Sequence, residues 1–162
     1  MIVVADTSPL NYLIQLGQAV LLNELYGQVL VPEAVARELA HAAAPEIVRS
    51  WIGSPPAWLT IVAVRDRDLS LPFQLGEGES EAISLALELN LAVLLDDQRA
   101  RKEAELRNVP TAGTLAVLVQ GALRKKLNLE DALHHLRLLQ FRISYEIEAH
   151  ALARYRTLSK DL

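Results

Sequence analysis

The sequence contains no cysteine among its 162 residues. This absence excludes disulfide bonds, zinc sites built from thiolates and cysteine nucleophiles. Long apolar runs are also missing, since stretches such as residues 91–95 and 115–119 are far too short to cross a bilayer. The N-terminus has no basic segment and reaches the acidic Asp6 almost at once. We therefore expect no signal peptide and a cytoplasmic protein that makes no contact with a membrane.

Basic residues are outnumbered by acidic ones, with 16 Lys and Arg against 20 Asp and Glu and a formal net charge of −4. This balance argues against a protein that binds nucleic acid through bulk electrostatics. It still allows a local basic patch beside an acidic site that a metal ion neutralises. Hydrophobic residues make up 51% of the chain, which is enough to bury a sizeable core. The length suits one domain over residues 1–162.

Short apolar runs alternate along the chain with segments of helical character. Strands are predicted at residues 2–5, 28–31, 59–64, 92–95 and 109–111. Segments between them begin at Thr, Ser or Pro and stop at Gly, as helices do, and three closing helices are expected after residue 113. A helix over residues 79–89 is apolar nearly all round and should be buried. This alternation is typical of an α/β fold, in which helices cover both faces of a short parallel sheet.

Acidic residues lie where such folds bind ligands, beyond the carboxyl ends of the strands. Asp6 follows the first predicted strand, and Asp96 and Asp97 follow the fourth. Glu38 and Glu81 lie in apolar helices that start near the same edge, and neither has a Lys or Arg three or four residues away. A carboxylate on an apolar helix is costly without a cation. A divalent metal ion would neutralise these acids.

Carboxylates without a cysteine or histidine cluster suit a hard cation that prefers oxygen ligands, and Mg²⁺ or Mn²⁺ fits best. Such ions polarise phosphoryl oxygens and promote hydrolysis of phosphodiesters. A simpler interpretation exists for each acid taken alone, because acids at helix starts cap the helix and complement its dipole. Asp97 could cap the helix that follows it, and Glu79 has the position of an ordinary first-turn acid.

Five short segments carry a more specific signal because they occur together and in order. They are IVVADTSPL at residues 2–10, VPEAVAREL at 31–39, GEGESEAI at 76–83, LLDDQRAR at 94–101 and TAGT at 111–114. In this order they resemble the PIN-domain family, and within it the VapC-type toxin-like ribonucleases, in a less characterised bacterial branch. The resemblance covers residues 1–125 and leaves residues 126–162 as closing helices that could contribute a dimer contact.

The resemblance implies an α/β/α sandwich and a metal-dependent endoribonuclease that is the toxin of a toxin–antitoxin pair. It implies that four acids are catalytic and bind the Mg²⁺ or Mn²⁺ ion: Asp6, Glu38, Glu81 and Asp97. It implies supporting roles in the site for four neighbours: Ser8, Asp96, Glu79 and Thr114. Asp96 remains an alternative to Asp97, and Glu79 to Glu81. The third acid is often Asp in the toxins, and the longer Glu81 in this chain could shift the metal geometry.

Further features bear on partners. Arg99 and Arg101 follow the aspartate pair and are candidates to hold RNA phosphates, or else they form a solvated helix face. The terminal helix carries an apolar stripe at Ile143, Ile147, Ala151, Leu152 and Tyr155. The stripe predicts docking on the core, or contact within a homodimer of the kind that the family commonly forms. A cognate antitoxin protein would be a further partner.

Two other functions compete with the nuclease. The first is a non-catalytic module that keeps the PIN fold and binds nucleic acid or protein. The second is a receiver-like phosphoacceptor domain, which needs a late catalytic Lys directly after a strand. Neither Lys102 nor Lys125 follows a predicted strand, so the receiver-like interpretation ranks low.

Overall fold

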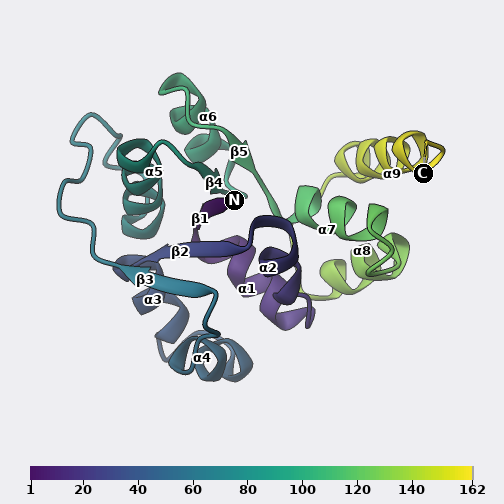
Figure 1. Ribbon diagram of the computed structural model, residues 1–162, viewed down its shortest axis with the longest axis horizontal. Helices are drawn as coiled ribbons and strands as arrows, with labels where there is room; N and C mark the ends of the chain where they lie inside the picture. The colour runs from purple at the N-terminus through teal and green to yellow at the C-terminus, as the bar shows by residue number, and fades with distance from the viewer. Residues whose placement is uncertain (162) are drawn as a thin grey trace.

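The computed structural model describes residues 1–161, and the strands in this range form a five-stranded sheet (Figure 1). The strands are β1 (Ile2–Ala5), β2 (Gln28–Pro32), β3 (Leu59–Val62), β4 (Ala92–Leu94) and β5 (Thr111–Ala112). Their spatial order is β3-β2-β1-β4-β5, and each neighbouring pair is parallel. The central strand is therefore β1, in which Val4 pairs with Leu30 on one side and with Val93 on the other.

Helices occupy the connections between these strands and the C-terminal part of the chain. They are α1 (Thr7–Gln15), α2 (Val20–Tyr26), α3 (Glu33–Ala40), α4 (Glu46–Gly53), α5 (Glu77–Leu89), α6 (Gln98–Leu106), α7 (Thr114–Leu123), α8 (Leu129–Leu138) and α9 (Tyr145–Ser159). Val3 and Ala5 pack in one cluster with α1, α2, α4, α7 and α8, whereas Val4 packs with α5 and α6 on the other face. The predicted α/β/α arrangement around a parallel sheet is confirmed.

Two helix starts meet the carboxyl edge of the sheet, and local chemistry explains each. Asp6 keeps an extended backbone and donates its N–H to the carbonyl of Leu94 at 3.1 Å, so the strand runs directly into α1. Pro9 lies in the first turn, where a missing N–H breaks no helical hydrogen bond. The other start is that of α5, where the N–H of Gly76 donates to the Glu79 carboxylate at 3.0 Å.

Two expectations about burial need correction. The last turn of α5 is not buried, since Leu87 and Leu89 are 41% and 45% exposed and the buried residues end at Ala86. The stripe of α9 docks only in part: Ala151 is buried, but Ile147 is 44% exposed.

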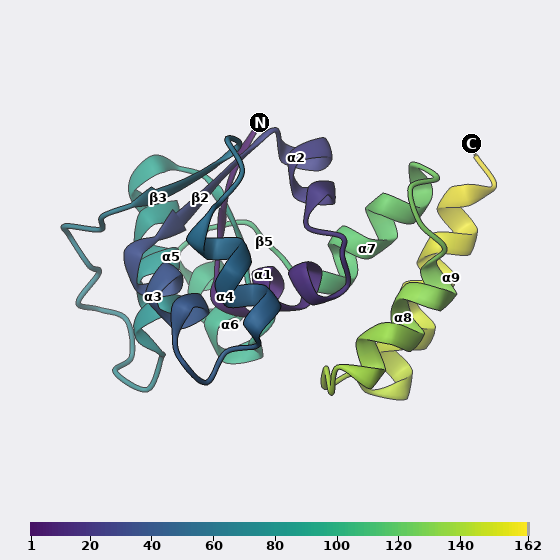
Figure 2. The same ribbon diagram turned by 90° about the horizontal axis from the view of Figure 1, so that it is seen from below.

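Helices α7, α8 and α9 lie together at one side of the sheet (Figure 2). Within residues 1–161, no helix combines the length and apolarity needed to cross a membrane.

Candidate active site

Asp6 is a buried carboxylate at the C-terminal end of the central strand. The residue is 4% exposed, and its Oδ1 atom is buried with no hydrogen-bond partner in the part of the chain that the structure describes. Burial is the main cause that raises the pKa of Asp6 to about 8. The nearby carboxylates of Glu79, Glu38 and Asp96 raise this pKa further, while the backbone amide of Thr7 lowers it. The site thus has a buried acid that lacks a positive partner.

Glu38 approaches Asp6 from the C-terminal half of α3. Its carboxylate accepts a hydrogen bond from the Thr7 hydroxyl and another from the N–H of Gly78 at 3.0 Å. A Cβ atom at position 78 would lie 2.7 Å from Oε1 of Glu38, so a residue other than glycine would push the carboxylate out of this position. The first residues of α1 and α5 therefore hold Glu38 in place between them.

Asp96 enters the site from the end of β4. Its Oδ2 accepts hydrogen bonds from the hydroxyls of Ser8 at 2.9 Å and Thr114 at 2.7 Å. Its Oδ1 accepts the backbone N–H of Thr114 at 2.8 Å. Ser8 and Thr114, both expected as supporting residues, thus lie in direct contact with Asp96.

Glu79 and Asp97 lie beside each other at the same edge. Burial is the main cause that raises the pKa of Glu79, and the charges of Asp97 and Glu38 raise it further. Asp97 is exposed, and its Oδ1 accepts the N–H of Ala100 at 2.9 Å, so it caps α6 as the simpler interpretation proposed. Of the two aspartates, Asp96 is the one that contacts Ser8 and Thr114, and Asp97 points to the helix start.

Both carboxylate oxygens of Glu81 have partners outside the group of acids around Asp6. Its Oε2 accepts the N–H of Ala34 in the first turn of α3 at 3.1 Å, and its Oε1 pairs with the Arg67 guanidinium at 3.1 Å. No Lys or Arg of the same helix is placed to pair with Glu81, as expected from the sequence, but Arg67 supplies the cation from a loop in place of a metal ion. The structure thus brings Asp6 and Glu38 together with Glu79 and Asp96. Glu81 instead links α5 to the first turn of α3 through its hydrogen bond with Ala34.

The two arginines expected near the aspartates differ in their surroundings. Arg99 is exposed, and its charge lowers the pKa of Glu79. Arg101 is half-buried; its Nε donates to the carbonyl of Leu95 at 2.7 Å, and its Nη2 lies 4.0 Å from Oδ1 of Asp96. Both guanidinium groups therefore lie close to the acidic cluster, the name we give to Asp6, Glu38, Glu79 and Asp96.

Asp6, Glu38 and Glu79 line an open cavity of about 360 Å³. Asp96 lies next to it, because Ser8, which also lines the cavity, donates a hydrogen bond to Asp96. As the side chains lie, no three Asp, Glu or His groups within residues 1–161 are arranged to hold a metal ion directly. The unpartnered Oδ1 of Asp6, surrounded by further acids, nevertheless suits a hard cation. Mg²⁺ in particular keeps several waters and needs only one or two direct carboxylates. The donor set is thus compatible with a hydrated divalent ion.

Comparisons with known proteins decide the family. A family model described as a PIN domain matches residues 2–157. The chain belongs to the PIN-domain family. Among solved structures, this PIN domain matches a PilT N-terminus domain protein from the hyperthermophilic archaeon Sulfolobus solfataricus P2, with a TM-score of 0.54 and 15% identity. That match covers 74% of this chain and 92% of that chain, and it shows likeness of fold alone. No curated protein matches the chain.

Family membership gives the acidic cluster a chemical context, because PIN domains are generally metal-dependent nucleases. Sequence reasoning missed Thr7, Gly78 and Gly113 as parts of this PIN-domain site. Each lies inside a segment that carried the resemblance, and a Cβ atom at Gly78 or Gly113 would lie 2.7 Å from Oε1 of Glu38 or 2.8 Å from Oδ1 of Asp96. Glycine at such points indicates a close approach by another group, and this signal could have found them.

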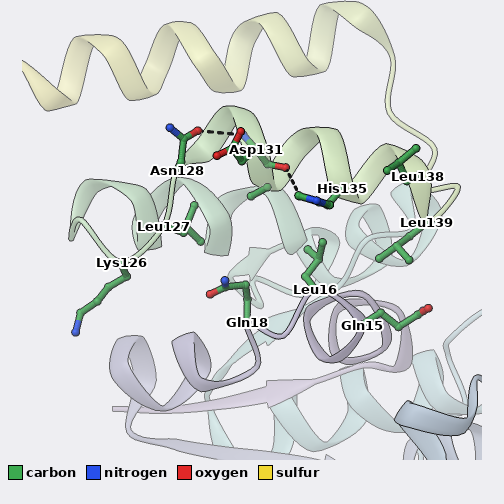
Figure 3. A pocket seen from close by; sticks show the side chains of 11 residues that line it. Gln15, Leu16, Gln18, Lys126, Leu127, Asn128, Asp131, His135, Leu138 and Leu139 are labelled. Atoms are coloured by element: carbon green, nitrogen blue, oxygen red, sulfur yellow. Dashed lines mark hydrogen bonds between the residues drawn. The ribbon is translucent and has the colours of Figure 1, made fainter.

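A separate cavity lies between the end of α1 and helix α8 of the PIN domain (Figure 3). It has a volume of about 560 Å³. Figure 3 shows its polar wall, where the Asn128 side chain accepts a hydrogen bond from the N–H of Asp131. Nδ1 of the His135 ring forms a hydrogen bond with the carbonyl oxygen of Asp131. Asp131 is the single acid among the described residues that line it, so this cavity does not gather carboxylates for a cation.

Proposed function

We propose that this PIN-domain protein is a Mg²⁺- or Mn²⁺-dependent endoribonuclease that hydrolyses RNA phosphodiesters. One observation carries the proposal: the unpartnered, buried Oδ1 of Asp6 lies among the carboxylates of Glu38, Glu79 and Asp96. An ionised Asp6 is unfavourable in these surroundings unless a cation compensates it. A divalent ion would do so, and it would let an otherwise acidic site accept a phosphodiester.

The proposed roles follow from the contacts of each residue. Asp6 would hold the ion together with Glu38, Glu79 and Asp96, and Asp97 would add a further negative charge nearby. Glu81 is left out of this set because Ala34 and Arg67 already occupy its carboxylate. When bound, such an ion polarises a phosphoryl oxygen and promotes attack by water.

The remaining residues position the acids rather than contact the substrate. Thr7 and Gly78 fix the Glu38 carboxylate by hydrogen bonds from α1 and α5. Ser8 and Thr114 do the same for Asp96 from α1 and α7. Rigid elements therefore hold the acids close together before any ion binds, which lowers the reorganisation needed for catalysis.

We propose that the chain acts in the cytoplasm as a single PIN-like domain over residues 1–162 and as the toxin of a toxin–antitoxin pair. The exposed apolar side chains of Leu138 on α8 and Tyr145 on α9 support a homodimer or antitoxin contact at this end of the chain. Co-purification with the product of a neighbouring reading frame would test the antitoxin, and light scattering would test the dimer.

A cleavage assay tests the activity itself. Purified protein should cleave single-stranded RNA when Mg²⁺ or Mn²⁺ is present and not in excess chelator. Asp6→Asn should lower the rate by about 100-fold or more, because it removes the negative charge that binds the ion. Asp131→Asn makes the same chemical change on the distant helix α8 and serves as the matched control. If wild type binds RNA in metal but never cleaves it, the protein is a non-catalytic interaction module and the proposal is wrong.

A further inference from the structure

A third cavity lies next to Asp96, because it is lined by Gly113, where a Cβ atom would lie 2.8 Å from Oδ1 of Asp96. It has a volume of about 470 Å³ and lies between the β5–α7 segment and α9. Its charged or titratable lining groups are Arg101, His150 and Arg154, with Tyr26 beside them, and no Asp or Glu of the described residues lines it. In a chain with a formal net charge of −4, a cavity lined by two arginines and no acid is a local positive site. We call it the arginine pocket.

Arg101 is held in place before any ligand binds. Its Nε donates to the Leu95 carbonyl at 2.7 Å, and a Cβ atom at Gly113 would lie 1.8 Å from its Nη2. The guanidinium therefore rests against the Gly113 backbone, where another residue would displace it. Its 4.0 Å separation from Asp96 is too long for a hydrogen bond, so most of its five N–H donors remain for a ligand.

Arg154 and His150 supply the opposite wall from α9. They are four residues apart and therefore lie on the same face of the helix, together with Ile147 and Ala151. Both side chains are exposed, and neither forms an ion pair with an acid among residues 1–161. An exposed guanidinium in a concave site without an acidic partner suits a phosphate, which it can bind with two parallel hydrogen bonds.

We propose that the arginine pocket binds a backbone phosphate of the RNA strand beside the one that is cleaved. This inference rests on the proposed function. The pocket and the acidic cluster share a wall, because Gly113 lines the pocket while the N–H of the next residue, Thr114, donates to Asp96 at 2.8 Å. A strand whose scissile phosphate reaches the cation would thus meet Arg101 next. The half-buried, apolar side chain of Leu115 gives the sugar and base a surface to pack on.

Binding without cleavage tests this inference. A fluorescein-labelled single-stranded RNA is titrated with full-length protein in excess chelator, and its anisotropy is followed at several salt concentrations. Arg154→Gln should weaken binding by fivefold or more and reduce the slope of log K against log salt by about 0.7, which is the value for one lost contact to a single strand. Arg156→Gln is the matched control, since Arg156 lies on the same helix, near Glu130 at 3.7 Å, and does not line the pocket.

Several outcomes would overturn the inference. The first is equal affinity of Arg154→Gln and Arg156→Gln for RNA, with circular dichroism confirming that both are folded. Failure of wild type to bind the RNA at all would be equally decisive. A third is a pocket that selects acidic protein: poly-glutamate binding that depends on Arg154 while RNA binding does not.

The same proteins separate this inference from the proposed function. If wild type and Arg156→Gln bind RNA, Arg154→Gln binds it poorly, and none cleaves it with Mn²⁺, the pocket is supported and the nuclease proposal fails. If wild type cleaves RNA while Arg154→Gln and Arg156→Gln bind it equally well, the nuclease stands and the pocket proposal fails.

Discussion

For single residues, the site depends on how the charge of Asp6 is compensated. Burial makes the protonated form the stable one up to a pH of about 8, so a proton occupies the position in which a cation would otherwise act. A metal ion binds the ionised carboxylate and must displace that proton. Cation binding by this protein should therefore strengthen as the pH rises towards 8.

The raised pKa of Asp6 predicts how stability depends on pH in the absence of metal. An unfolded Asp ionises near pH 3.9, whereas the native Asp6 ionises near pH 8, so the native state holds one more proton between these values. The contribution of this proton to the free energy of unfolding is fully present below about pH 4 and is lost as the pH rises to about 8. The free energy of unfolding should therefore fall by up to about 1.4 kcal/mol per pH unit in this range. Urea unfolding in chelator from pH 5 to 8 measures this decrease.

The control for this prediction is Asp6→Asn, which cannot titrate at this position. Its free energy of unfolding should fall less steeply over the same pH range, and near pH 8 it should exceed that of metal-free wild type. Parallel curves for the two proteins would show that Asp6 is ionised in the native state throughout this range.

Gly78→Ala tests the placement of Glu38. The added Cβ would lie 2.7 Å from Oε1 of Glu38, so this flexible carboxylate has to move away from Asp6. We expect Mn²⁺ affinity to fall by about tenfold, the size of effect typical for a residue that orients a metal ligand, while the fold is retained. Gly53→Ala has open space around its Cβ and should leave the affinity unchanged. Equal affinities in both variants would contradict the role given to Glu38.

The sequence could indicate Asp6 and Glu38 but could not choose among their neighbours. Asp96 and Asp97 are adjacent, and small differences in where the strand ends decide which one faces Ser8. Glu79 and Glu81 are two positions apart on one helix, so they point to different sides. The partner of Glu81, Arg67, comes from a loop whose path no periodicity predicts.

At the scale of elements, the strands were easier to predict than the contacts between helices. Runs such as residues 2–5 are apolar because parallel strands are covered on both faces, and this pattern fixed their positions to within one or two residues. Helix α5 begins at Glu77 rather than at residue 79, because Gly76 and Glu79 form the helix start. Its packing on α3 depends on Glu81, which sequence periodicity could not show.

The contact between α5 and α3 gives an element-scale prediction. Glu81→Ala removes the acceptor for the Ala34 N–H at the start of α3 and leaves Arg67 without one of its partners. The loss of this cap should lower the free energy of unfolding by about 1–2 kcal/mol. Under conditions where the variant is folded, its Mn²⁺ affinity should stay within about twofold of wild type. An affinity as low as that of Asp6→Asn would instead show that Glu81 is a metal ligand.

For the whole molecule, the arrangement of charge matters more than its total. The net charge of −4 argued against nucleic-acid binding through bulk electrostatics. The fold gathers Glu38, Glu79 and Asp96 around Asp6, and it places Arg101 and Arg154 in a neighbouring cavity that no acid of the described residues lines. Residues from α1, α3, α5, β4 and α7 meet only in the folded chain, so composition could not reveal this separation.

Calorimetric titration of Mn²⁺ into wild type and Asp6→Asn at pH 8 tests the central claim most directly. The account predicts saturable binding to wild type, with protons released when the ion displaces them from Asp6. It predicts that Asp6→Asn binds at least tenfold more weakly and releases fewer protons. Indistinguishable titrations of the two proteins would contradict a cation site built on Asp6.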